Sequence, residues 1–158
     1  MPRTKRVTLE NACYHIITRG NQKQTVFRDS EDFQRYLLLL EKYKRKFRFK
    51  LYCFCFMPNH VHLIIEVENP QELQRLMKGL NLSYSLYFNI KYNKVGHLWQ
   101  DRFKSKIIEK DDYFLECINY IEANPVRASI VNSISEYPWN SFVFRMRNDG
   151  ILDKIDLV

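Results

Sequence analysis

The segment from residue 49 to residue 67 constrains the fold of this chain more than any other segment. Two extended apolar runs, residues 49–57 and 60–67, are separated only by Pro58-Asn59, which favours a tight turn. We therefore expect an antiparallel β-hairpin. Because successive side chains of a strand point to opposite faces, residues two apart share a face. The second run then has one apolar face, and its more polar face carries His60, His62, Ile64 and Glu66.

His60 and His62 are the most informative residues on that face, because the chain has only four histidines. Two imidazoles side by side on one strand can hold a single metal ion. The alternative is a solvated pair of histidines that binds nothing. Because His-x-His is a common pattern, the spacing alone does not decide between the two.

Capping residues and hydrophobic periodicity define the remaining elements. In chain order they are a strand at 13–18, a helix after Asp29 that reaches residue 47, the hairpin, a helix that begins after Asn69 with Pro70 in its first turn and ends at 93–96, a strand at 103–108, and a helix from Asp111 or Asp112 to about Asn124. This order is the split βαβ, ferredoxin-like pattern of an α+β fold. We expect an antiparallel sheet with two helices on one face, which leaves the other face free for a site.

A length of 158 residues fits a single domain, and no linker or repeat divides the chain. We expect a core at about 12–142, a basic N-terminal arm at 1–11 and an irregular tail at 132–158. No apolar run is long enough to span a bilayer, and no secretory signal follows the basic N-terminus. The expected compartment is the cytoplasm, with no membrane partner.

The charge balance favours a polyanionic partner, because 25 Lys and Arg residues outnumber 18 Asp and Glu residues and give a net charge of +7. An aromatic content of 15% suits single-stranded nucleic acid, where bases stack on rings, although at least half of these rings must fill the core. The four cysteines fit neither a disulfide framework nor a zinc ribbon. Cys53 and Cys55 are predicted to be buried as small apolar side chains.

Tyr120 and Asn124 are four residues apart on the last predicted helix, so they share one face of it. Glu116 precedes Tyr120 by one turn on the same side. Tyr120 lies off the apolar stripe that would anchor this helix to the sheet. An amphipathic tyrosine at the margin of the core is the alternative to a functional one.

The run MPNHVHLI at residues 57–64 resembles the HUH motif of single-tyrosine HUH transposases, a family that includes the smallest insertion-sequence transposases and the REP-associated tyrosine transposases. Four other family blocks are matched in the same order by YHIITRGN at 14–21, GHLWQDRFKS at 96–105, YIEANPVRA at 120–128 and YPWNS at 137–141. The resemblance extends from about residue 12 to residue 142.

This resemblance implies a transposase that cleaves and rejoins single-stranded DNA through a 5′-phosphotyrosine and recognises DNA hairpins near element or repeat ends. It also implies that the cytoplasmic protein works at the bacterial nucleoid. It implies that Tyr120 is the nucleophile and that His60, His62 and Asn124 are metal ligands. The implied ion is Mg²⁺ or Mn²⁺, whereas imidazole ligands alone would favour zinc or nickel. Metal-bound water or Glu116 could serve as the base.

Other readings stay open at this point. One is a non-catalytic or domesticated DNA-binding protein with the same fold, and another is a nuclease that uses water instead of tyrosine. Both a monomer and a homodimer that completes its active sites in trans are compatible with the family.

Candidate DNA-binding residues are the basic side chains near the predicted strand ends and one tryptophan. They are Arg3, Lys5, Arg6, Arg19, Lys23, Arg28, Trp99, Arg102, Lys104 and Lys106. The cations before residue 29 could hold the phosphates of a hairpin stem. Arg102, Lys104 and Lys106 could contact DNA or support the last predicted strand. Trp99 could stack on a base, but a place in the core is the favoured alternative.

Overall fold

A four-stranded antiparallel sheet organises the chain, and the computed structural model describes residues 8–155. The strands are β1 (Ala12–Arg19), β2 (Lys50–Met57), β3 (His60–Val67) and β4 (Lys104–Ile108). They lie in the order β2-β3-β1-β4, and each neighbouring pair is antiparallel. The predicted hairpin is formed by β2 and β3, and the predicted ferredoxin-like arrangement is confirmed.

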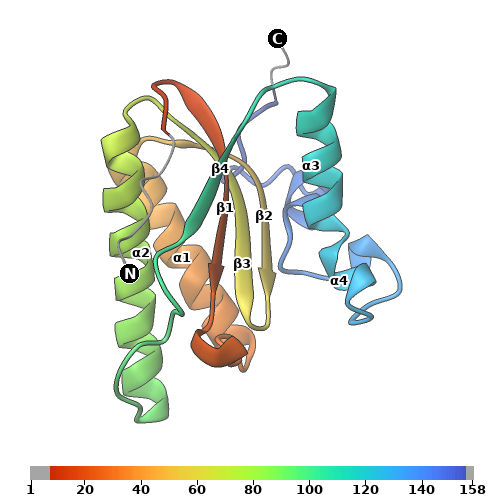
Figure 1. Cartoon of the computed structure of the whole chain (residues 1–158). Helices are drawn as coiled ribbons and strands as arrows, with labels where there is room; N and C mark the ends of the chain where they lie inside the picture. Colours follow the sequence, from red (N-terminus) through yellow and green to blue (C-terminus); the bar gives the residue numbers. More distant parts are fainter. Residues whose placement is uncertain (1–7, 156–158) are drawn as a thin grey trace.

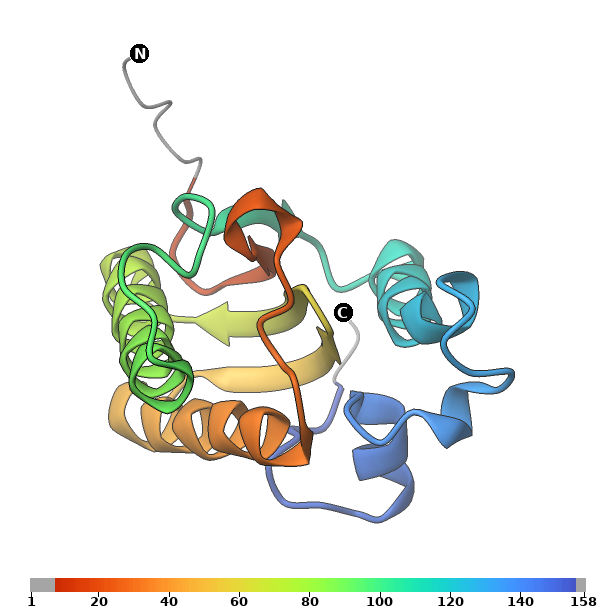
Figure 2. The same cartoon turned by 90° about the horizontal axis from the view of Figure 1, so that it is seen from below.

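The helices cover the two faces of the sheet unequally. They are α1 (Ser30–Phe47), α2 (Pro70–Tyr92), α3 (Asp112–Glu122), α4 (Asn124–Arg127) and α5 (Ser141–Met146), with 3-10 turns η1 (Asn21–Lys23) and η2 (Ile134–Glu136). Figures 1 and 2 show α1 and α2 side by side on one face and α3 on the other. No helix within residues 8–155 has the length and apolarity needed to cross a bilayer.

The predicted caps set the helix starts. The Asp29 side chain accepts a hydrogen bond from the amide of Asp32, and Asn69 accepts one from the amide of Gln71. Asp111 caps α3 in the same way. This helix ends at Glu122, slightly earlier than expected, and Asn124 opens the short helix α4. The following proline fits there because the first turn of a helix needs no amide donor.

Large apolar side chains fill the space between the sheet and the two long helices. Val61, Leu63 and Ile65 of β3 point into this layer, as the alternating pattern predicts. Aromatic rings from α1, α2 and β2 surround them, and those of Tyr36, Phe54, Tyr84 and Phe88 are fully buried. The opposite face buries a smaller cluster that includes Cys53 and Cys55, which confirms their prediction as buried apolar side chains.

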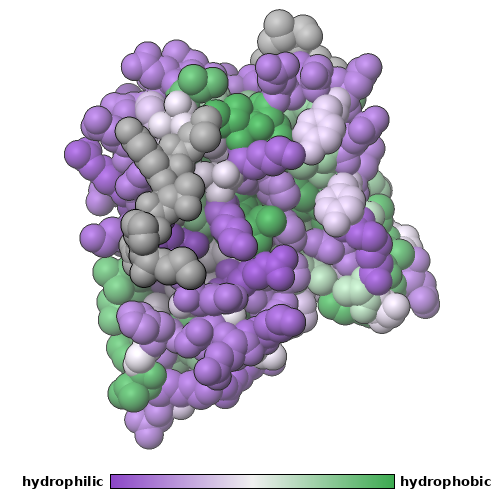
Figure 3. All heavy atoms as spheres, viewed as in Figure 1, coloured by the Kyte–Doolittle hydropathy of each residue, from purple (hydrophilic) through white to green (hydrophobic). Residues whose placement is uncertain are grey.

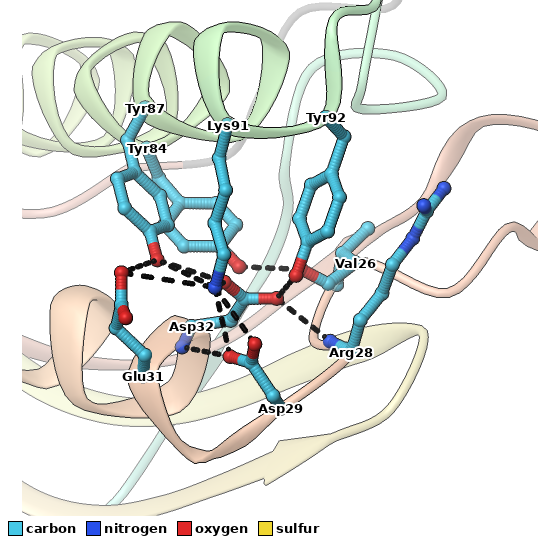
Figure 4. Close-up of polar contacts among 9 residues, drawn as sticks. All are labelled: Val26, Arg28, Asp29, Glu31, Asp32, Tyr84, Tyr87, Lys91 and Tyr92. Atoms are coloured by element: carbon cyan, nitrogen blue, oxygen red, sulfur yellow. Dashed lines mark hydrogen bonds and ion pairs between the residues drawn. The ribbon is translucent and has the colours of Figure 1, made fainter.

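A buried carboxylate ties α1 to α2 at the end of the helix layer (Figure 4). Asp32 accepts hydrogen bonds from the Tyr92 hydroxyl at 2.5 Å, the Tyr87 hydroxyl at 2.8 Å and the Lys91 ammonium at 2.9 Å. The backbone amide of Arg28 donates a further bond at 2.9 Å. Burial alone would raise the pKa of Asp32, but these donors outweigh it and lower the pKa. Asp32 therefore links the first turn of α1 to the last turns of α2.

The chain after α4 covers the outer edge of β2. The Phe56 amide donates to the Trp139 carbonyl at 2.9 Å, and the Tyr137 hydroxyl donates to the Phe56 carbonyl at 2.5 Å. Farther along, the Phe54 amide donates to the Ser141 hydroxyl at 3.1 Å. Between residues 132 and 155 the tail contains η2 and α5, and these bonds attach it to the sheet. It satisfies backbone groups that an edge strand would otherwise leave open to another chain.

Candidate active site

His60 and His62 lie together on the sheet face opposite α1 and α2. Their ring centroids are 4.9 Å apart, so the predicted pairing on one strand face is confirmed. The strand register places Arg19 opposite His60 and Cys55 opposite His62. His62 is only 5% exposed, whereas His60 is half-buried at the start of the strand. The pair therefore lies where the sheet face meets solvent.

The hairpin turn before His60 is fixed from the neighbouring loop. The Gly20 amide donates to the Asn59 carbonyl at 2.9 Å, and the Val26 amide donates to the Pro58 carbonyl at 2.8 Å. A β-carbon on Gly20 would come within 2.4 Å of the Gln24 carbonyl oxygen, so this approach requires glycine. The end of β1 and the loop after it thus set the position of the first histidine.

One nitrogen of each histidine ring has a partner. Nδ1 of His60 is 2.6 Å from Oδ1 of Asn59, and Nδ1 of His62 is 3.0 Å from Nε2 of His15. Burial is the main cause that lowers the pKa of His60 to about 4 and that of His62 to about 3. Both imidazoles are therefore neutral at neutral pH, which is the form that binds metal. The remaining nitrogen of each ring is Nε2.

These residues fit a divalent ion that completes its coordination with oxygen. Within residues 8–155, no three His, Cys, Asp or Glu side chains are grouped as a metal site. An ion on His60 and His62 would therefore need other ligands, such as an amide, a phosphate or water. The predicted third ligand, Asn124, is half-buried at the first residue of α4.

Tyr120 presents its phenol to solvent from α3. Its side chain is 58% exposed, while the other side of the helix packs Phe114, Ile118 and Ile121 against the sheet. The guanidinium carbon of Arg127 lies 3.7 Å from the centroid of the Tyr120 ring, a cation–π contact. The charge of Arg127 also contributes to the lowered pKa of His62. Arg127 therefore contacts the ring of Tyr120, and its charge also acts on His62.

Basic residues line the same face. Lys104 pairs with Ile17 and Lys106 pairs with His15, so both lysines are on the histidine side of β4. Arg19, opposite His60, is exposed at the end of β1. Figure 3 shows hydrophilic side chains gathered over β4. The face that holds the histidines is therefore edged with positive charge, which favours phosphate.

The other candidate DNA-binding residues are more dispersed. Lys23, Arg28 and Arg102 are exposed in the loops around the strand ends. The Arg28 guanidinium lies over the rings of Tyr92, at 4.3 Å, and Phe88, at 5.2 Å. The candidates in the basic arm, Arg3, Lys5 and Arg6, lie outside the described residues.

Trp99 lies in the core and offers no surface platform. It is 9% exposed, and its Nε1 donates to the Asn81 carbonyl at 3.0 Å. Its ring has edge contact with Tyr36. The structure thus favours the core alternative for this residue, because little of its ring is exposed for a base to stack on.

The sequence interpretation missed two residues of this site, His15 and Arg127. Arg127 was within a recognised block but was given no role. His15 is two positions from Ile17, which pairs with His62, so it reaches the site only through the pairing of β1 with β3. Strand order could have suggested that β1 neighbours β3, but the register was needed to find His15.

Comparisons with known proteins agree with this architecture. The family model for "Transposase IS200 like" matches residues 8–124. A Haemophilus influenzae protein assigned as a REP-associated tyrosine transposase is 28% identical over 105 residues, which span 60% of this chain and 59% of that relative. The match thus covers little more than half the length of the relative.

Two solved structures share the fold. A REP-associated tyrosine transposase bound to a REP hairpin matches with a TM-score of 0.77 and 20% identity, over 100% of this chain and 92% of that one. A protein from Deinococcus radiodurans assigned as a transposase matches with a TM-score of 0.52 and 19% identity, over 77% of this chain and 96% of that one.

Proposed function

Because this chain belongs to the IS200-like transposase family, we propose that it cleaves and rejoins single-stranded DNA with Tyr120 as the nucleophile. Family membership supports a DNA-processing activity. The finer assignment of Tyr120 is carried by one observation: its exposed phenol ring contacts Arg127, and the charge of the same arginine contributes to the lowered pKa of His62. The sheet face beside them is basic, which suits a backbone phosphate.

The proposed cleavage is a transesterification. The phenolic oxygen of Tyr120 gives up its proton to a base and attacks a backbone phosphorus. The new O–P bond forms as the bond between phosphorus and the 3′ oxygen breaks, and the 3′ oxygen leaves as a hydroxyl group after it takes up a proton. The resulting 5′-phosphotyrosine conserves the phosphodiester energy, so a second 3′-hydroxyl can reverse the step and join strands.

His60, His62 and Asn124 are proposed to hold a magnesium or manganese ion, which would act as a Lewis acid on the scissile phosphate. The neutral state of both histidines supports this role, because a protonated imidazole binds no metal. Arg127, Lys104 and Lys106 are proposed to bind phosphates next to the scissile one. Their positive charge would stabilise the additional negative charge of the transition state.

The proposed substrate is single-stranded DNA that forms a hairpin. A structural neighbour was solved with a REP hairpin, and the match covers 100% of this chain and 92% of that neighbour. Lys23 and Arg28 are exposed in the segment next to the β2–β3 turn that precedes His60. We therefore propose that these two residues contact the stem of the DNA hairpin.

A labelled hairpin DNA with a single-stranded extension tests the proposal in the presence of Mn²⁺. We expect a protein–DNA adduct that survives denaturing electrophoresis and that Tyr120→Phe abolishes. Tyr113→Phe is the matched control, because Tyr113 is 49% exposed on the same helix. We expect it to form the adduct normally.

The other outcomes of this experiment have distinct meanings. Cleaved DNA without an adduct would indicate a nuclease that uses water. Binding without cleavage would indicate a DNA-binding protein. An adduct that persists in Tyr120→Phe would overturn the assignment of the nucleophile.

A further inference from the structure

His15 is the closest polar neighbour of His62 among the contacts of that ring. It comes from β1, and its Nε2 lies 3.0 Å from Nδ1 of His62. The ring centroids are 5.3 Å apart and the ring planes are inclined by 24°, so the two rings meet nearly edge to edge through these nitrogens. Nε2 of His15 faces Nδ1 of His62, so this nitrogen is occupied by the neighbouring ring. His15 is therefore placed to orient a ligand and not to be one.

We propose that His15 is a positioning residue that accepts a hydrogen bond from Nδ1–H of His62. A neutral imidazole carries one proton, so a proton on Nδ1 leaves the lone pair on Nε2. His62 then offers Nε2 to the ion that the proposed function requires, on which this inference depends. Asn59 serves His60 in the same way, because its side-chain oxygen lies 2.6 Å from Nδ1 of His60. Partners of this kind fix both the tautomer and the orientation of a metal-binding ring.

The other nitrogen of His15 extends this chain of contacts to the tyrosine helix. Nδ1 of His15 lies 4.0 Å from Sγ of Cys117, which is on α3 one turn before Tyr120. Burial raises the pKa of the Cys117 thiol, so the group stays neutral. Because Nε2 of His15 must accept from His62, the His15 proton belongs on Nδ1, where it faces this sulfur. The helix that carries the proposed nucleophile thus packs directly on the residue that orients the metal ligand.

The proton position can be measured without any variant. Long-range ¹H–¹⁵N correlation spectra distinguish the two neutral tautomers of each histidine ring in the folded, metal-free protein. We expect His62 protonated on Nδ1 and His15 protonated on Nδ1, and the same assignment after saturation with Mg²⁺. A proton on Nε2 of His62 in both states would overturn the proposal.

A pair of variants tests the consequence for metal binding. His15→Gln keeps an oxygen acceptor within reach of His62, whereas His15→Leu removes the acceptor and keeps an apolar side chain. Titration of the protein with Mn²⁺, with free Mn²⁺ read by electron paramagnetic resonance, should show about 10- to 100-fold weaker binding for His15→Leu. We expect His15→Gln to stay within about threefold of the unaltered protein, as expected when the hydrogen bond is retained.

His97→Leu is the matched control, because His97 is exposed in the loop before β4 and should not alter Mn²⁺ affinity. Equal affinity for His15→Leu and the unaltered protein would contradict the inference. If the unaltered protein bound no Mn²⁺, the proposed metal site would fail. The tautomer of His62 in the metal-free protein would still decide the role of His15, so the two failures can be told apart.

Discussion

The two faces of the sheet are built from the same four strands but serve different purposes. The face under α1 and α2 buries large aromatic and aliphatic side chains, and its main polar group, Asp32, is satisfied by several donors. The face under α3 buries small side chains such as Cys53 and Cys55 and holds His60 and His62 at its margin. One face is closed by two long helices, whereas the other is covered by one short helix.

This difference assigns most of the folding stability to one face of the sheet and the proposed reaction to the other. The closed face removes much apolar surface from water, which is the main favourable contribution to folding. The half-covered face keeps imidazoles neutral by burial and still leaves Tyr120 and the basic rim accessible. Substitutions on the two faces should therefore have effects of different kinds, and that expectation can be tested.

The largest expected effects come from one substitution on each face. Leu80→Ala, at a fully buried position of α2, should lower the free energy of unfolding by about 2–5 kcal/mol. Cleavage by the fraction that remains folded should be unchanged. His60→Ala should reduce cleavage at least about 100-fold, which corresponds to the several kcal/mol that an ion contributes to such a transition state. Urea unfolding measures the free energy of unfolding, and an assay with hairpin DNA measures cleavage. If His60→Ala lost stability but kept its cleavage activity, the proposed difference between the two faces would be contradicted.

Asp32→Asn should destabilise the helix layer by about 3 kcal/mol, because it removes the charge of a buried carboxylate and leaves its donors without a full partner. The measurement is urea unfolding at neutral pH. The proposed site is on the opposite face, so Mn²⁺ affinity of the folded variant should be unchanged. A neutral effect on stability would show that the contacts in Figure 4 contribute little.

Glu122→Gln should have a smaller effect that extends to the site. Glu122 is buried at the end of α3 and accepts hydrogen bonds from Arg145 at 2.6 Å and Ser141 at 2.8 Å. Loss of hydrogen bonds to a charged group costs about 1.5–3 kcal/mol. Because these bonds hold the tail to the helix that carries Tyr120, we expect adduct formation to slow as well. If the variant were less stable but formed the adduct at an unchanged rate, Glu122 would have only a structural role.

The smallest expected effect is on the pH dependence of stability. The pKa of Asp32 is lowered in the folded protein, so its contribution is present above the unfolded value of 3.8. That contribution is lost as the pH falls through 3.8 toward the folded pKa. The stability difference between the unaltered protein and Asp32→Asn should therefore be constant from pH 7 to about 5 and shrink below about 4. A difference that grows toward low pH would contradict the lowered pKa.

Local chemistry predicted much of the fold. The hairpin, the caps at Asp29 and Asn69 and the shared face of His60 and His62 follow from turn residues, capping residues and the period of a strand. These features depend on neighbours in sequence. The missed features depend on contacts between segments far apart, such as the contact of His15 with His62 or the three donors from α2 on Asp32. The cover of β2 by the tail has the same origin, because Trp139 carries no local signal for pairing.

The most direct test of the central claim is a map of the covalent bond between protein and DNA. After reaction with hairpin DNA and Mn²⁺, tryptic digestion should give a peptide of residues 111–127, which contains both Tyr113 and Tyr120. Tandem mass spectrometry locates the nucleotide on one of the two rings. We predict a 5′-phosphate ester on Tyr120. A nucleotide on Tyr113, or cleaved DNA with an unmodified peptide, would contradict the account.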